Sequence, residues 1–147
     1  MKFKLIINKD AEEEIVATVH SRSSLTQRIE EMVMAFSGED YLLGYSDDEI
    51  RKIPYERIEC ITILDRRVMA IDTEGGRYLL KERLRDLDGI LPSYFIRINK
   101  STIANEQGIL KFEAVFSGGV DAVFHSGYRD YVSRRCFSEI RRRYEGK

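Results

Sequence analysis

The apolar positions of the chain follow a strand-like period, then a helical one, within the first 48 residues. Residues 2–8 alternate loosely and residues 15–20 are apolar and β-branched, so each segment predicts a strand. Ser24 and Gln27 then fit a capping box. A helical face follows, formed by Leu25, Ile29, Met32, Val33 and Phe36, with Gly38 as the end of the helix. Residues 1–48 therefore predict a β-β-α unit.

From residue 41 onward the strand-like period returns and predominates, interrupted by short helices. Residues 41–45 and 49–53 flank the turn residues Ser46-Asp47-Asp48 and predict a hairpin. Further strands are expected over 58–63, 68–71, 78–80, 95–98, 109–116, 120–124 and 128–132. Short helices are expected over 84–91 and from a cap at Ser133, and a tight helical turn over 101–105. The pattern over residues 49–147 predicts a mainly β, α+β domain.

Composition places the chain among ordinary globular proteins. Its 147 residues are 43% hydrophobic and 33% charged, and the apolar runs are far shorter than the roughly 18 residues of a membrane span. The N-terminal apolar stretch is also too short for a signal peptide, so we expect a cytoplasmic protein. Cys60 and Cys136 have no cysteine or histidine at metal spacing, and we expect neither a metal nor a cofactor.

Motifs of catalysis are absent from the sequence. We find no glycine-rich phosphate loop, no nucleophile elbow and no histidine pair on a helix. The acidic clusters at 12–14 and 30–31 are most simply solvated surface. Enzymatic activity is therefore not expected.

Charge is divided unevenly along the chain, although its formal sum is only −1. Residues 1–50 carry five Lys/Arg and eleven Asp/Glu, whereas residues 51–147 carry nineteen and fourteen. Electrostatic fields are local within about 10 Å at ordinary ionic strength, so an acidic N-terminal part need not cancel a basic face elsewhere. The near-zero net charge therefore does not exclude a polyanionic partner for residues 51–147.

Arg134 and Arg135 stand where folding alone would not place them. They follow the expected cap at Ser133, in the first turn of a helix, where positive charge opposes the macrodipole at a cost of about 0.3–1 kcal/mol per group. The position becomes favourable if an anion binds there, because free amides and guanidinium groups would converge on it. A DNA phosphate fits. The three arginines 141–143 lie near the C-terminal end of the same helix, where cations are favoured anyway, and are more simply structural.

Two loops offer further polar and basic groups. Asn99, Lys100 and Ser101 follow the strand over 95–98, where Asn99 could read a base edge and Lys100 could hold a phosphate. Ser101 has the simpler alternative of capping a turn. Arg66 and Arg67 lie at an expected hairpin tip, whose simpler interpretation is a solvated turn.

Taken together, these segments resemble the LytTR family of DNA-binding domains. The resemblance rests on FIRINKSTIAN from Phe95 and YVSRRCFSEIRRRY from Tyr131, with IPYERIECI from Ile53 and RYLLKERLRDL from Arg77 before them. It covers roughly residues 49–147. It implies an elongated stack of short antiparallel sheets with short helices, and a bacterial transcription regulator that reads bases mainly from loops. The family's contacts would fall at Arg67, at residues 99–101 and at Arg135.

The N-terminal unit, residues 1–48, departs from relatives that carry a receiver domain. It is too short for a receiver and lacks the repeated βα pattern, so it is closer to stand-alone members, some of which are governed by a membrane protein. Homodimerisation, or binding of a membrane-protein partner through this unit, is a hypothesis at this stage.

Three functions compete on the sequence. The leading one is a regulator that binds double-stranded promoter DNA through Arg66, Arg67, Asn99, Lys100, Ser101, Arg134 and Arg135. The second is a protein-interaction or sensor module whose basic face binds an acidic partner. The third is binding of RNA or single strands, which usually needs exposed aromatic platforms. Tyr128 and Tyr131 are candidates for such platforms, but strand alternation favours packing for both.

Overall fold

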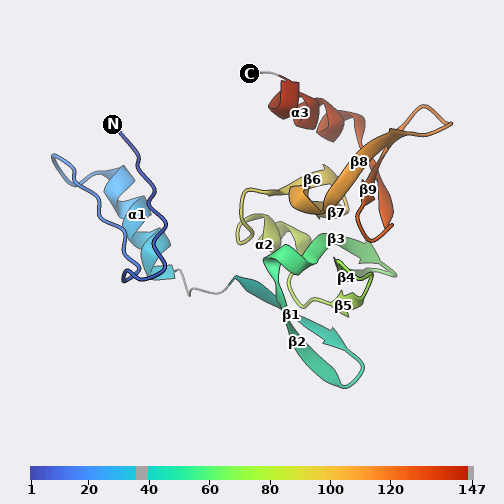
Figure 1. Ribbon diagram of the computed structural model, residues 1–147, viewed down its shortest axis with the longest axis horizontal. Helices are drawn as coiled ribbons and strands as arrows, with labels where there is room; N and C mark the ends of the chain where they lie inside the picture. The colour runs from blue at the N-terminus through green and yellow to red at the C-terminus, as the bar shows by residue number, and fades with distance from the viewer. Residues whose placement is uncertain (36–39, 146–147) are drawn as a thin grey trace. The chain divides into compact units, whose positions relative to one another are not determined.

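The computed structural model describes residues 1–35 and 40–145, and the chain divides into two compact units (Figure 1). The units are Met1–Glu39 and Asp40–Lys147. The sequence placed the boundary after residue 48 instead. The strand β1 (Tyr41–Ser46) belongs to the second unit because it pairs along its whole length with β2 (Glu49–Pro54) and touches β5 at Tyr45.

The first unit contains one helix, α1 (Ser24–Ala35), and no strand among its described residues. The strands predicted over 2–8 and 15–20 are therefore wrong as regular elements. Both segments keep their apolar side chains in solvent; Phe3 is 89% exposed and Ile7 is 83% exposed. A lone pair of extended segments is marginal in water unless a third strand or a packed face supports it, and residues 1–35 supply no strand.

The start of α1 also differs from the expected capping box. Helical geometry begins at Ser24, and the Ser23 N–H donates to Thr26 Oγ1 at 2.9 Å. The cap thus sits one residue earlier than predicted, with Thr26 in place of Gln27 as the returning side chain. Phe36 and Gly38, expected on the helix face and at its end, lie outside the described residues.

The second unit is built on an antiparallel sheet of seven strands in the order β2-β1-β5-β4-β3-β7-β6. Its remaining strands are β3 (Ile58–Leu64), β4 (Arg67–Asp72), β5 (Arg77–Leu79), β6 (Phe95–Asn99) and β7 (Thr102–Asn105). A second sheet has three strands in the order β10-β9-β8: β8 (Ile109–Ala114), β9 (Val120–Phe124) and β10 (Arg129–Val132). The helices are α2 (Leu84–Asp88) and α3 (Arg134–Glu145), with 3-10 turns at Tyr55–Arg57 and Glu106–Gly108.

Two hydrophobic cores lie on opposite faces of the larger sheet. Ile61, Ala70 and Ile103 point into the first core, which α2 closes with Leu84 and Leu87. The residues next to them in the chain point the other way, into the second core: Cys60, Ile71 and Ala104. The smaller sheet and α3 complete this core with Phe124 and Ile140. Because successive residues of a strand face opposite sides, a strand buried on both faces reads as a continuous apolar run. This explains the IECI segment of β3.

Two local predictions in this unit need correction. Residues 101–105 form the turn into β7 and the strand itself, not a helical turn, because Thr102, Ile103 and Ala104 pair with β3. The β3–β4 turn consists of Asp65 and Arg66 alone, and Arg67 already pairs with Leu64. The hairpins and the helix after Ser133 agree with the sequence-based expectation, and the helix expected over 84–91 is present but ends at Asp88.

Candidate nucleic-acid interface

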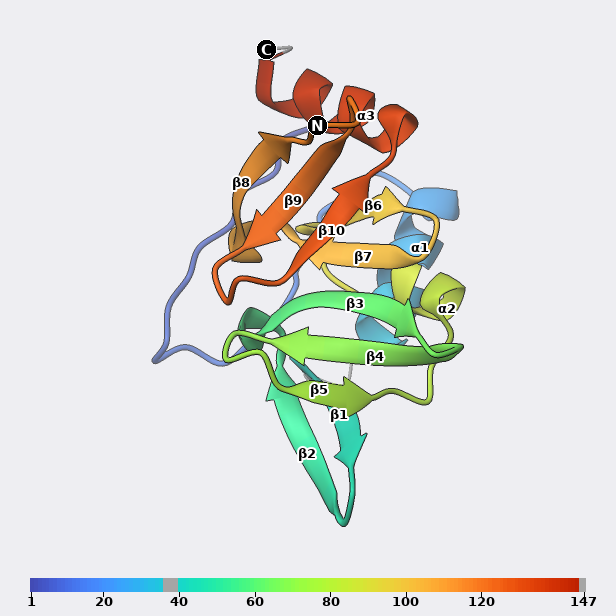
Figure 2. The same ribbon diagram turned by 90° about the vertical axis from the view of Figure 1, so that its right-hand side faces the viewer.

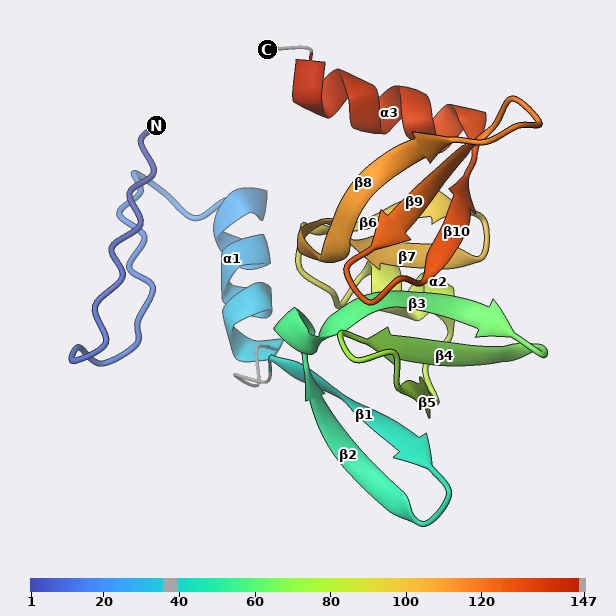
Figure 3. The ribbon, with the colours of Figure 1, turned by 45° about the vertical axis from the view of Figure 1, so that its right-hand side comes forward.

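Three segments that are far apart in the sequence meet along one edge of the second unit (Figures 2 and 3). They are the β3–β4 turn, the β6–β7 turn and the first turn of α3, all on the right-hand side of both views. Backbone hydrogen bonds join them: the Ile63 N–H donates to Ser101 O at 3.2 Å, and the Ser133 N–H donates to Ile98 O at 2.8 Å. We call this the three-loop edge.

The β3–β4 turn holds two residues in the left-handed backbone region. Asp65 has φ 51° and Arg66 has φ 64°, the pattern of a type I′ hairpin turn. Glycine and asparagine adopt this region readily, whereas a left-handed arginine costs about 1–2 kcal/mol. Arg66 and Arg67 are both exposed. A strained, exposed arginine at a turn tip is a reasonable sign of function.

The β6–β7 turn is held rigidly by Arg97. Its guanidinium pairs with Asp88 (Nη2 to Oδ2, 2.9 Å) at the end of α2 and also donates from Nη1 to Lys100 O at 2.8 Å. Lys100 itself is exposed and Ser101 is half-buried. The turn therefore presents one free ammonium group from a fixed backbone.

Asn99 does not belong to this exposed set, contrary to the expectation that it reads a base edge. It is 1% exposed, its Nδ2 donates to Tyr131 O at 2.8 Å, and its Oδ1 accepts from the Ser101 N–H at 2.8 Å. Both ends of the amide are used inside the protein. Asn99 therefore positions the β6–β7 turn against β10.

The first turn of α3 places two guanidinium groups at the end of the helix where anions are favoured. Ser133 caps it as predicted, accepting from the Cys136 N–H at 3.2 Å, and no acidic residue occupies the first turn. Arg134 and Arg135 are exposed; the side chain of Arg135 is 90% exposed and lies 3.9 Å from Glu139. Such a solvated pair contributes little, so both guanidinium groups remain available to a ligand.

Arginines at the other end of α3 have internal partners. Arg143 pairs with Glu106 at 2.7 Å and Arg141 with Glu145 at 3.4 Å. These ion pairs agree with the expectation that Arg141 and Arg143 have structural roles. The three-loop edge thus carries one exposed carboxylate, Asp65, and five exposed cationic side chains: Arg66, Arg67, Lys100, Arg134 and Arg135.

Tyr131 is the residue of this edge that the sequence missed. Packing was expected for both Tyr128 and Tyr131, and Tyr128 does pack against the second core. Tyr131, however, is 49% exposed on β10, three residues before Arg134. Alternation along β10 carried the signal, since Val132 is the buried residue and its neighbours must face outward.

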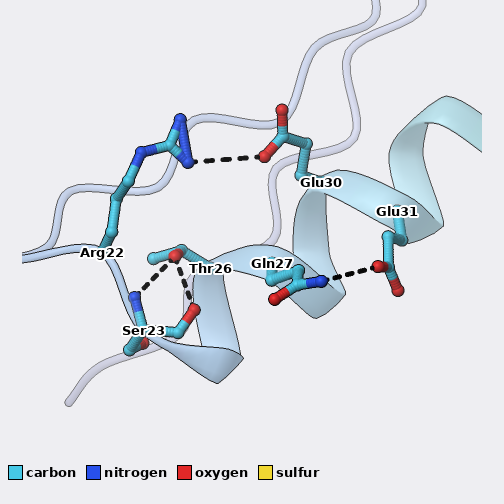
Figure 4. Close-up of a pocket in the computed structure, with 6 residues that line it drawn as sticks. All are labelled: Arg22, Ser23, Thr26, Gln27, Glu30 and Glu31. Atoms are coloured by element: carbon cyan, nitrogen blue, oxygen red, sulfur yellow. Dashed lines mark hydrogen bonds and ion pairs between the residues drawn. The ribbon is translucent and has the colours of Figure 1, made fainter.

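A surface hollow of about 690 Å³ lies in the first unit (Figure 4). Its lining groups satisfy one another: Arg22 faces Glu30 at 3.7 Å, and Gln27 Nε2 donates to Glu31 at 3.1 Å. Two carboxylates with a single arginine would repel a polyanion. This hollow is not a candidate for nucleic-acid binding.

Chemistry beyond charge is sparse in the described part of the chain. Residues 1–35 and 40–145 hold no cluster of His, Cys, Asp and Glu suited to a metal ion. Burial raises the pKa of the Cys60 thiol, so this cysteine remains a protonated core side chain. No helix over the same residues is long and apolar enough to cross a membrane.

Comparison with known proteins defines the fold first. A solved LytTr DNA-binding domain from Bacillus cereus superposes with a TM-score of 0.66, at 20% identity, over 74% of this chain and 99% of its own length. The two-sheet domain described above is therefore a LytTR-type fold, mostly β with short helices.

The family follows from sequence matches. A model of the LytTr DNA-binding domain matches residues 48–145, two thirds of the chain. Two Staphylococcus aureus proteins, from strains NCTC 8325 / PS 47 and MSSA476, are 30% and 32% identical over 97% of both chains, and each is named an HTH-type transcriptional regulator. This chain belongs to the LytTR family of DNA-binding domains.

The helix-turn-helix of those names has no counterpart among the described residues of this chain. Five strands separate α1 from α2, and five separate α2 from α3. Two helices joined by a short turn, as that motif requires, do not occur there.

Proposed function

We propose that this protein is a non-enzymatic, cytoplasmic transcription regulator that binds double-stranded promoter DNA sequence-specifically through the three-loop edge. One observation carries the proposal: exposed cations from three distant segments converge on one edge, and two of them occupy the unfavourable end of α3. The proposed contacts are Arg66, Arg67, Lys100, Ser101, Arg134 and Arg135. Tyr131 adds an exposed ring three residues before Arg134.

Each group has a chemical role in this proposal. Lys100 is a compact charge on a fixed turn and would hold a phosphate. The free amides at the start of α3 would bind a second phosphate together with Arg134. Arg135 and the strained Arg66–Arg67 tip have the reach and the donor geometry for bidentate contacts to guanine. Asn99, which is buried, is left out of the contact set.

The first unit would serve association. Its extended segments expose large apolar side chains, among them Phe3, Ile7 and Val16, which favour burial against another protein surface. We propose that this unit mediates homodimerisation. A membrane-protein partner would use the same unit.

The test compares Arg135→Ala with Lys100→Ala on two DNA duplexes. One duplex is a cognate site selected from a random pool with the full-length protein, and the other is random sequence. We expect Arg135→Ala to weaken the cognate site by about 1–3 kcal/mol and random DNA far less. Lys100→Ala should weaken both similarly and flatten the slope of log K against log salt by about one.

Arg142→Ala is the matched control, because it removes an arginine from the opposite end of the same helix. It should leave both affinities within about twofold, as expected for a surface charge outside the contacts. Equal losses on both duplexes for Arg135→Ala would remove its base-reading role. Preference for RNA or single strands, or no affinity for any oligonucleotide, would contradict the proposal and favour the alternatives raised by the sequence.

A further inference from the structure

A chain of hydroxyl groups ends on a carboxylate directly behind the three-loop edge. Thr62 and Thr102 lie opposite each other on β3 and β7, with their Oγ1 atoms 2.7 Å apart. Thr102 Oγ1 also donates to Asp130 Oδ2 on β10, at 2.6 Å. A hydroxyl has only one proton to donate, so Thr62 must donate to Thr102. The direction of the chain is therefore Thr62 to Thr102 to Asp130.

This polar seam joins the two sheets where the contact segments begin. Thr62 is 3% exposed and Thr102 is fully buried. Thr102 follows the β6–β7 turn immediately, Thr62 stands two residues before the end of β3, and Asp130 lies four residues before Arg134. The second oxygen of Asp130 accepts from the Tyr131 N–H at 2.8 Å. Each member thus lies within four residues of one of the three contact segments.

A second link of the same chemistry joins the sheets at the other end of β3. Ser126, in the turn before β10, donates from Oγ to the Glu59 carboxylate, and its N–H donates to Glu59 Oε2 at 3.0 Å. Glu59 is completely buried. Both links therefore stabilise the packing of one sheet on the other, but only the Thr62–Thr102–Asp130 seam lies beside the contact segments.

We propose that the Thr62–Thr102–Asp130 seam is a positioning device that sets the start of α3 against the β6–β7 turn and so determines discrimination between DNA sequences. The inference rests on the proposed DNA-binding function. Base reading requires several side chains to meet base edges in fixed register, whereas phosphate contact by flexible cations tolerates small shifts. Loosening the seam therefore reduces the ratio of cognate to random affinity and leaves random affinity unchanged. The seam residues contact no DNA themselves.

The experiment compares Thr102→Val, Thr102→Ser and Ser126→Ala in the full-length protein. Valine keeps the shape and β-branching of threonine but cannot donate to Asp130; serine keeps the hydroxyl. We expect Thr102→Val to reduce the cognate-to-random ratio about tenfold, with random affinity and the salt slope unchanged. Thr102→Ser should restore most of the ratio. Ser126→Ala should lower the melting temperature about as much as Thr102→Val does, but it should leave the cognate-to-random ratio at the wild-type value.

All measurements are made below the melting transition of every variant, which circular dichroism establishes first. An unchanged ratio in Thr102→Val overturns the positioning role, as does an equal loss of ratio in Ser126→Ala, because a general loosening of the sheets would then explain both. If Thr102→Val does not fold, the same comparison is made with Thr62→Val, which removes the first hydroxyl and leaves the Thr102–Asp130 bond. Failure of the wild-type protein to discriminate between the two duplexes would instead contradict the proposed function.

Discussion

The two units of this protein contain similar apolar, β-branched segments, yet only one unit turns them into strands. Residues 2–8 and 15–20 resemble β3 and β7 in composition. In the second unit, β3 and β7 each have a neighbouring strand on both sides and a hydrophobic core on both faces. In the first unit the segments have no assigned partner strand, and their apolar side chains stay exposed.

The difference shows what a strand requires beyond its residue types. β-Propensity measures how well a side chain fits a pleated, half-buried surface, and that surface must be supplied by other segments. The second unit supplies it through 10 strands in two sheets. The first, with one helix in its described part, does not. We therefore expect the stability of the chain to reside in the second unit.

The largest expected effect comes from the same truncation made once in each unit. Phe124 is 1% exposed in the second core, and Phe124→Ala should reduce the free energy of unfolding by about 3–5 kcal/mol. Phe3 is 89% exposed in the single chain, so Phe3→Ala should change this free energy by no more than about 0.5 kcal/mol at protein concentrations too low for dimerisation. Urea unfolding followed by circular dichroism measures both. A loss in Phe3→Ala that appears only as the protein concentration rises would support the proposed homodimer, whereas a large loss at every concentration would contradict the assignment of stability to the second unit.

Removal of residues 1–39 tests whether the second unit folds and binds alone. We expect the fragment to melt within a few degrees of the full chain, because both hydrophobic cores lie in residues 42–140. On random duplex DNA its log K should fall with log salt at a slope of about −4 to −5, if the fragment neutralises about five phosphates in all. A folded fragment that no longer binds DNA would contradict the placement of the contacts in the second unit, and a slope near zero would contradict phosphate binding.

Within the second unit, Arg66→Gly should separate stability from binding. Glycine relieves the left-handed strain at φ 64°, so the free energy of unfolding should stay level or rise by up to about 1 kcal/mol. Cognate affinity should fall because a proposed contact is lost. Asp47→Gly is the matched control, since Asp47 has φ 41° in the β1–β2 turn, away from the contact segments. Unchanged affinity in Arg66→Gly would exclude this residue from the interface.

The smallest effect concerns the pH dependence of the three-stranded sheet. Hydrogen bonds from Lys111, at 2.8 Å, and from Arg129, at 3.1 Å, hold the pKa of Glu113 below its ordinary value. A carboxyl whose pKa is depressed in the folded state stabilises the protein above its unfolded pKa, and loses that contribution as the pH falls through the folded pKa. Glu113→Gln should therefore lower the melting temperature slightly at pH 7 and progressively less toward pH 3. A constant difference across that range would contradict the assignment.

Much of the second unit could be predicted because its signals are local. The Ser133 cap, the hairpins around 46–48 and 65–67, and the alternation of β10 depend on residues within a few positions of each other. The family motifs named the segments on which the exposed cations Arg66, Arg67, Lys100, Arg134 and Arg135 lie. The first unit could not be predicted in this way, because its strand-like segments needed partners that the chain does not provide in the described residues.

The sequence by itself determined most elements of the second unit, its family and the positions of its cations along the chain. Only the tertiary structure decided which polar residues face solvent. Asn99 and Lys100 are neighbours with equal claims as DNA contacts, yet Asn99 bonds to Tyr131, 32 residues away, and only Lys100 is exposed. Thr62, Thr102 and Asp130 come together across 40 and 28 residues. No local pattern records such pairings, because they depend on the register of the strands and on how one sheet packs against the other.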